Sequence, residues 1–170
     1  MREYAPFFEW FQKDRKELGV VEALLGSLNQ TSGSSFCSPR IQHPDPPDCI
    51  CFNAEGGLVA VEVAEVVCEE AARLTAQGEQ VMRVWRPEEL KMRVVDLLDG
   101  KDGKTFHGGP YADIITCLFT DEPMLTLEHV NSELGNTSFG PYKQLTSAFL
   151  VLSYDPSTKS YPVVTLRVSQ

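Results

Sequence analysis

Apolar residues near the start of the chain recur with the period of a helix. Within residues 2–29, phenylalanine, valine and leucine return every three or four positions, which places them on one helix face. Gly19 interrupts this pattern and predicts a division into two helices. A Ser/Gly-rich connector at 31–35 and the proline-rich stretch SPRIQHPDPP follow. Because neither can continue a helix, we expect an extended chain that leads into the first strand.

The next apolar run changes to the two-residue period of a strand. Residues 49–53 and 58–67 flank Gly56 and Gly57, which predicts an antiparallel hairpin with its turn at the glycines. Beyond the hairpin, a helix is expected to begin near Pro87, since proline is favoured in the first turn of a helix.

Helix and strand patterns alternate along the remainder of the chain. The other expected elements are a helix at 68–77, a buried strand at 112–120, a helix at 126–134 capped by Thr126, and strands at 147–154 and 161–168. This order predicts a central mixed β-sheet flanked by helices, of the α/β or α+β class. We expect one domain over residues 1–170, with an N-terminal helical segment at 1–30, a core at 46–120 and a helix with a C-terminal hairpin at 121–170.

The composition is that of an ordinary globular protein. The 170 residues are 42% hydrophobic and 23% charged, which suits one folded domain with a buried core. The net charge of −9 argues against tight non-specific binding to nucleic acid or to an anionic membrane. No apolar run approaches the roughly 18 residues of a membrane span, and the N-terminus lacks the apolar core of a secretory signal. A cytoplasmic protein without a membrane partner is therefore expected.

The five cysteines match neither a disulfide framework nor a zinc site. Cys49 and Cys51 lie two apart on a predicted strand and so face the same side, but no second pair of Cys or His accompanies them. We expect small, reduced and buried thiols, and no zinc site.

Two carboxylates stand in the hairpin where core residues are expected. Glu62 shares its strand face with small apolar residues. In an antiparallel hairpin the numbers of opposed residues add to a constant. A turn centred on Glu55 therefore places Asp48 opposite Glu62, and a turn centred on Gly56 places Asp48 opposite Ala64 and diagonal to Glu62. Both registers bring the two carboxylates within about 5–8 Å of each other.

Two like charges this close in an apolar layer require compensation. A divalent metal is one solution, because Mg²⁺ is commonly held by one or two carboxylates together with waters and substrate phosphates. The alternative is that Asp48 begins the strand in a polar turn while Glu62 pairs with a Lys or Arg from a covering helix. The sequence leaves both explanations open.

The proline-aspartate pair, the hairpin turn and the acidic strand residue together resemble the restriction-endonuclease-like, PD-(D/E)xK, superfamily. The stretches PPDCICF, VAVEVAEVV, FTDEPMLT and AFLVLSYDPSTKSYPV are similar to a bacterial branch of that superfamily. The resemblance in fold covers roughly residues 10–120. It implies a core of helix, mixed sheet and second helix, and a metal site, but supplies no substrate.

Residue by residue, Asp48 matches the motif aspartate and Glu62 the second acidic residue, while Ala64 stands where the motif has lysine. In the superfamily that lysine orients the attacking water and supports charge on the phosphate. Loss of one such preorganised group costs about 3–4 kcal/mol of transition-state stabilisation. An enzyme with this sequence therefore needs a replacement, and we favour Lys104, then Lys101, because both flank the end of a helix just before the central strand.

The resemblance also implies a further acidic metal ligand from the first helix. Glu22, within GVVEALLGSL, is the candidate, whereas Glu9 and Glu17 are expected to be exposed charges. One functional hypothesis is a phosphodiesterase, most simply a nuclease acting on nucleic acid, with Mg²⁺ or Mn²⁺ held by the carboxylates. The alternative is a catalytically inactive nuclease fold that serves as a binding or interaction module, which Ala64 and the acidic surface favour. A lysine ammonium near both carboxylates would support the first.

Overall fold

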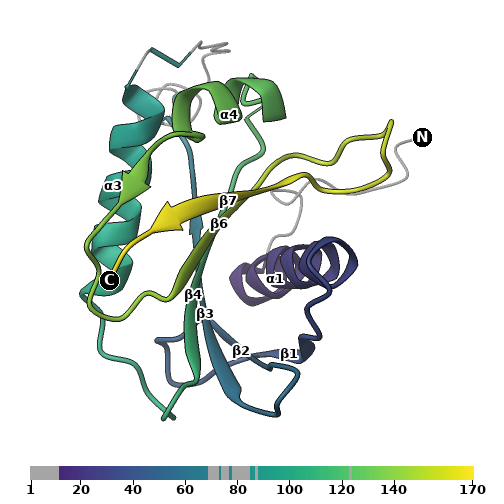
Figure 1. Ribbon diagram of the computed structural model, residues 1–170, viewed down its shortest axis with the longest axis vertical. Helices are drawn as coiled ribbons and strands as arrows, with labels where there is room; N and C mark the ends of the chain where they lie inside the picture. Colours follow the sequence, from purple (N-terminus) through teal and green to yellow (C-terminus); the bar gives the residue numbers. More distant parts are fainter. Residues whose placement is uncertain (1–11, 69–72, 74–76, 78–84, 87, 123) are drawn as a thin grey trace.

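The computed structural model describes residues 12–68, 73, 77, 85–86, 88–122 and 124–170 (Figure 1). In this part of the chain, three helices pack on one seven-stranded mixed β-sheet of strand order β1-β2-β3-β4-β6-β7-β5. The helices are α1 (Lys13–Thr31), α3 (Glu89–Asp102) and α4 (Leu127–Leu134). The strands are β1 (Cys37–Ile41), β2 (Cys49–Phe52), β3 (Leu58–Glu65), β4 (Asp113–Phe119), β5 (Ser138–Phe139), β6 (Ser147–Val151) and β7 (Val163–Val168).

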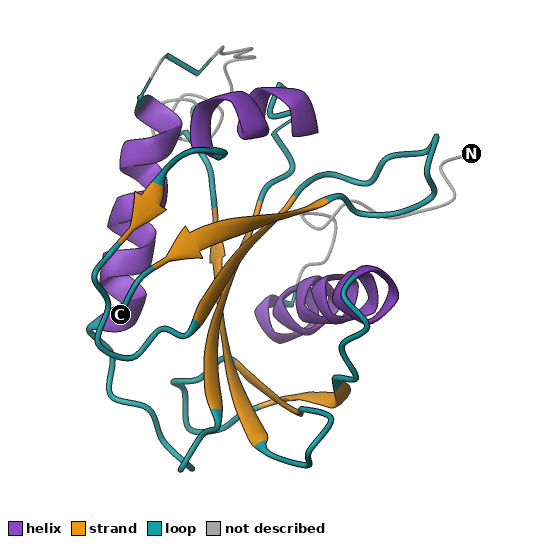
Figure 2. Cartoon of the chain, in the orientation of Figure 1, coloured by secondary structure: helices purple, strands orange, loops and turns teal. Residues whose placement is uncertain are grey.

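The three central strands, β3, β4 and β6, run parallel to one another. β2 pairs with β3, β1 with β2, and β7 with β6 in antiparallel fashion, while the short β5 adds to β7 in parallel. Parallel neighbours need a crossover connection, and α3 and α4 lie in the crossovers from β3 to β4 and from β4 to β6. Figure 2 shows α1 on one face of the sheet and α3 on the other.

Each face of the sheet builds its own apolar cluster. The face toward α1 buries alternate residues of β3 and β4 against helix residues, including Val59, Val61, Cys117, Val20 and Leu24. The face toward α3 and α4 buries Leu118 and Leu150 against Leu90, Val94 and Leu98. Because side chains alternate along a strand, Glu62 projects with its neighbours Ala60 and Ala64 into the layer beneath α3.

The predicted fold class is confirmed: a mixed sheet is flanked by helices, and the α/β elements follow the expected order. Thr126 caps α4 as expected, since its Oγ1 accepts a hydrogen bond from the amide of His129 at 3.2 Å. The predicted division of the first helix is wrong, because α1 runs without a break through Gly19. A glycine inside a helix costs only about 1 kcal/mol, and Val20, Val21 and Leu24 are fully buried nearby.

Two strands were not predicted, and some predictions cannot be compared. β1 forms within the proline-rich approach, where only an extended chain was expected, and β5 is a two-residue addition to the sheet edge. Most of the helix expected at 68–77, Pro87 and the aromatic residues before position 12 lie outside the described residues. Among the helices that are described, none is long and apolar enough to cross a membrane.

Four of the five cysteines are buried as expected, but Cys37 is exposed on β1. Burial raises the pKa of Cys49 to about 12 and that of Cys51 to about 11. These two thiols therefore stay protonated at neutral pH and act as small apolar side chains.

Candidate metal centre

The hairpin register places the two predicted carboxylates side by side. Cys49 pairs with Val61 across β2 and β3, so one step further Asp48 lies opposite Glu62. This is the register of a turn centred on Glu55, the first of the two predicted. Asp48 is 4% exposed and Glu62 is fully buried. Two carboxylates thus lie together beneath the surface of an apolar layer.

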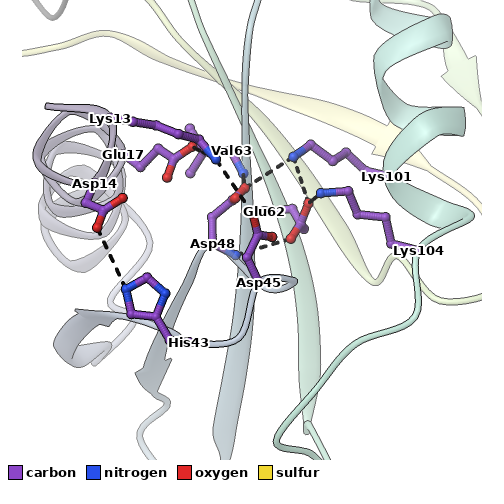
Figure 3. Close-up of polar contacts among 10 residues, drawn as sticks. All are labelled: Lys13, Asp14, Glu17, His43, Asp45, Asp48, Glu62, Val63, Lys101 and Lys104. Atoms are coloured by element: carbon purple, nitrogen blue, oxygen red, sulfur yellow. Dashed lines mark hydrogen bonds and ion pairs between the residues drawn. The ribbon is translucent and has the colours of Figure 1, made fainter. Parts of the chain in front are cut away.

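Both carboxylates are held by hydrogen bonds (Figure 3). Glu62 Oε1 accepts from the amide of Asp48 at 3.2 Å, and Glu62 Oε2 accepts from Lys101 Nζ and Lys104 Nζ, each at 2.7 Å. Asp48 Oδ2 accepts from the amide of Val63 at 2.7 Å and from Lys101 Nζ at 3.2 Å. No described residue donates to Asp48 Oδ1. Both Glu62 oxygens are therefore partnered, while Asp48 Oδ1 has no donor within the described residues that a ligand would have to displace.

The two lysines come from the end of α3, as the sequence suggested. Lys101 lies in the last turn of α3 and Lys104 just beyond Gly103, which caps it; a spacing of three residues keeps both on one side. Lys101 contacts both carboxylates and its side chain is 13% exposed, whereas Lys104 reaches only Glu62 and is 33% exposed. Lys101 thus contacts both carboxylates, whereas the sequence ranked Lys104 first; which of the two replaces the motif lysine stays a prediction. These ion pairs also supply the compensation that the alternative to a metal required.

A third carboxylate, Asp45, joins the cluster. One oxygen each from Asp45, Asp48 and Glu62 lies within 4.8 Å of the others, so the three could share an ion. Asp45 is exposed and also contacts Lys13 Nζ at 3.6 Å. Carboxylate oxygens are hard ligands that suit Mg²⁺ and Mn²⁺. The donor set and the open oxygen of Asp48 fit a divalent cation.

The acidic side chain that α1 contributes to this region is Glu17, not Glu22. Glu17 forms an ion pair with Lys13 at 3.4 Å and its side chain is only 13% exposed, contrary to the exposed position expected for it. Burial raises the pKa of Glu17, and the negative charge of Asp48 raises it further, while Lys13 opposes both effects. Glu22 is exposed, because five residues turn a helix by about 140° from the position of Glu17. The expected ligand Glu22 is therefore not brought to the cluster.

A signal for Glu17 was present in the sequence. Glu17 precedes Val21 by four residues and Leu24 by seven, and both are buried against the sheet. Residues at these spacings share one face of a helix, so the carboxylate lies on the inward face. Asp45 gave no comparable signal, since its place depends on how the proline-rich loop folds over β3.

A buried hydroxyl lies beside Glu62. Thr116 pairs with Glu62 in the parallel register of β3 and β4, and paired residues of neighbouring strands share one face of the sheet. Thr116 is fully buried, and its Oγ1 has no hydrogen-bond partner among the described residues. An unpaired buried hydroxyl costs about 1–3 kcal/mol. The layer around Glu62 thus contains a buried polar group in addition to the lysines that form its ion pairs.

No family model, curated protein or solved structure matches the chain. The molecule is a mixed α/β sheet that carries an acidic cluster of the buried Asp48 and Glu62 with the exposed Asp45, and this cluster could hold a metal ion. Two lysine ammonium groups bind one member of this cluster directly.

Proposed function

We propose that the protein is a metal-dependent phosphodiesterase of the PD-(D/E)xK type, most simply a nuclease. One observation carries the proposal: Lys101 Nζ lies 3.2 Å from Asp48 and 2.7 Å from Glu62, although the motif position for lysine holds Ala64. Ala64 lies on the same strand face as Glu62. A lysine from α3 therefore supplies the cation that β3 lacks.

The order of elements supports the assignment to this superfamily. A helix, a hairpin that carries the two acidic residues, a second helix and a parallel central strand follow one another from α1 to β4. That is the core implied by the resemblance. With Asp48 and Glu62, Asp45 offers up to three carboxylate ligands, and Mg²⁺ commonly binds one or two carboxylates together with waters and substrate phosphates.

Each residue of the cluster has a role in such a reaction. A divalent cation at this site would polarise the phosphate and lower the pKa of a bound water. Asp48 and Asp45 would hold the ion, and Glu62 is preorganised by three hydrogen bonds. Burial lowers the pKa of Lys104, but the bond and charge of Glu62 outweigh it, so the net pKa lies above its usual value. Lys104 is therefore a cation at neutral pH and would stabilise phosphate charge rather than accept a proton.

The inactive binding module remains the second candidate function, for a specific reason. Counting Glu17 and Lys13, the region holds four carboxylates against three ammonium groups, which leaves −1. The cluster is thus nearly neutral without any ion, and a buried ion-paired cluster of this kind can be purely structural. Metal binding separates the two functions.

Calorimetric titration of Mn²⁺ and Mg²⁺ tests the proposal without knowledge of the substrate. We expect one ion per chain in the wild type, binding at least about tenfold weaker in Glu62→Gln, and unchanged binding in Glu55→Gln, which removes the same charge at the exposed hairpin end. Cleavage of single-stranded and double-stranded DNA and RNA is then compared with and without the bound ion. A folded wild type that takes up no ion at millimolar Mn²⁺ contradicts the proposal.

A further inference from the structure

A pocket of about 580 Å³ adjoins the acidic cluster. It lies between the end of α3, the loop that leads from α3 to β4, and the segment before β6. Lys104 belongs to both sites, because it lines the pocket while its ammonium binds Glu62. A ligand in this pocket is therefore a direct neighbour of the proposed reaction centre.

An exposed cation lies on the pocket wall. Lys143 is exposed on the pocket wall, and its ammonium forms no ion pair with any residue that the structure describes. The acidic lining residue, Asp102, directs its carboxylate to the backbone amides of Lys143, Gln144 and Leu145 at 2.8–3.2 Å. Burial opposes the ionisation of Asp102, yet these amides lower its pKa below the usual range. The charge of Lys143 also lowers this pKa, so Asp102 compensates part of that charge, while the exposed ammonium of Lys143 can still meet an anion from solvent.

Two aromatic rings form another part of the wall. Phe106 and Tyr111 meet edge to face, with ring centres 6.4 Å apart and an interplanar angle of 73°. The Tyr111 hydroxyl donates a hydrogen bond to the carbonyl of His107, which fixes this ring within its loop. Both rings are half-buried and so keep part of their apolar surface accessible. Aromatic side chains beside a cation are the usual platform for an unpaired nucleobase.

An oriented polar group completes the pocket. Gln144 Nε2 donates to the backbone carbonyls of Asp102 and Lys104. Since the amide nitrogen is committed, Gln144 Oε1 is fixed as an acceptor, and no described residue donates to it. It can accept a hydrogen bond from an amino or imino group of a base.

We infer that this pocket binds one nucleotide of single-stranded nucleic acid, next to the phosphate that is cleaved. The base lies against Phe106 and Tyr111, and its phosphate lies at Lys143. The volume falls in the range of small-ligand sites, and a double helix does not fit into it. This inference rests on the proposed function and gives it a substrate class: single strands, or duplex ends that have opened.

Fluorescence anisotropy with a labelled thymidine hexanucleotide tests the pocket. The measurement is made in EDTA at low salt, so that neither cleavage nor a metal contributes. We expect Phe106→Ala to weaken binding about tenfold through loss of stacking. Lys143→Glu is expected to weaken it at least as much, because it reverses the charge of this exposed side chain. Lys159→Glu is the matched control: it makes the same charge change in the β6–β7 connection, which extends away from α3 in Figure 1.

The outcomes separate this inference from the proposed function. Absence of hexanucleotide binding, an unchanged affinity in Phe106→Ala and Lys143→Glu, or an equal loss in Lys159→Glu overturns the pocket inference. Mn²⁺ titration of the same proteins reports on the function: Phe106→Ala should bind the ion like the wild type. Intact ion binding without a pocket effect leaves the phosphodiesterase standing, whereas a wild type without ion binding contradicts it. Lys143 is exposed, so its variant tests the pocket even if Phe106→Ala fails to fold.

Discussion

Replacement of Lys101 by methionine tests the electrostatics of the cluster most directly. The ammonium of Lys101 contacts two carboxylates that are 4% and 0% exposed. Methionine keeps most of the apolar stem but removes the charge. Of the hydrogen bonds made within the described residues, Asp48 keeps that of the Val63 amide in Lys101→Met, together with the nearby charge of Lys13, while Glu62 keeps Lys104 and one amide.

The loss in free energy of unfolding depends on how much negative charge stays buried without a partner. Removing one partner of a buried ion pair destabilises a protein by about 3–5 kcal/mol, and we expect about 3 kcal/mol because Lys104 still compensates Glu62. Lys104→Met is the matched comparison. Its ammonium has one carboxylate partner and a side chain that is 33% exposed, so a loss of about 1 kcal/mol or less is expected. Urea unfolding in EDTA measures both free energies of unfolding.

The affinity for Mn²⁺ should increase in Lys101→Met, although the free energy of unfolding falls. In the wild type the ammonium of Lys101 and a divalent cation compete for the same two carboxylates, so Lys101→Met should bind Mn²⁺ more tightly while losing any phosphodiesterase activity. At a concentration 100 times its dissociation constant, the ion stabilises the folded state by about 2.7 kcal/mol and so offsets most of the loss.

Two results would refute this reasoning. An unfolding free energy of Lys101→Met equal to that of the wild type in EDTA would mean that the ion pairs do not hold the buried charges. Weaker Mn²⁺ binding in Lys101→Met would mean that the lysine supports the ion rather than competing with it. Lys159→Met, at an exposed lysine outside the cluster, should change neither quantity.

Further predictions concern the surroundings of the cluster. Asp102→Ala should lower the free energy of unfolding by about 2–3 kcal/mol in urea, since three backbone amides lose a charged acceptor. Because the folded-state pKa of Asp102 lies below its unfolded value, its contribution is present above about pH 3.9 and is lost as pH falls through the folded pKa. Acid unfolding of Asp102→Asn should therefore show a shallower loss of stability in that window than the wild type. Thr116→Val should stabilise the protein by about 1 kcal/mol in thermal unfolding, because it replaces an unpaired buried hydroxyl with a methyl group of the same shape; destabilisation would show that Oγ1 has a partner in solution.

The hairpin and its carboxylates could be predicted because the two-residue period and the turn allow only two registers. The structure selects between them through Asn53, whose side-chain oxygen accepts from the amides of Glu55 and Gly57 at 3.1 and 2.8 Å. This side chain folds the turn around Glu55. The prediction considered the two glycines and not the asparagine, and so left the register open.

The features that could not be predicted from the sequence depend on contacts between residues far apart in the chain. β1 contains Pro39 and a register shift between Cys37 and Arg40, features that are tolerated at a sheet edge but that give a weak strand signal. Asp45 enters the cluster only because its loop folds back over β3. Likewise, the choice between Lys101 and Lys104 depends on where α3 ends above the sheet, which no local pattern determines.

The net charge of −9 counts the whole chain and argues against non-specific binding of nucleic acid. It does not give the electrostatic potential at the acidic cluster itself. A phosphate near the cluster is influenced mainly by charges within a Debye length of about 8 Å at physiological salt. There the balance of −1 would become +1 with one divalent cation bound, while Lys143 and Asp102 on the adjoining pocket wall add no net charge. Under the proposed function, the cluster would therefore attract an anionic substrate mainly in the metal-bound state. The acidic remainder of the surface would repel long polyanions, which under the further inference favours a substrate held through one nucleotide over a duplex held along its length.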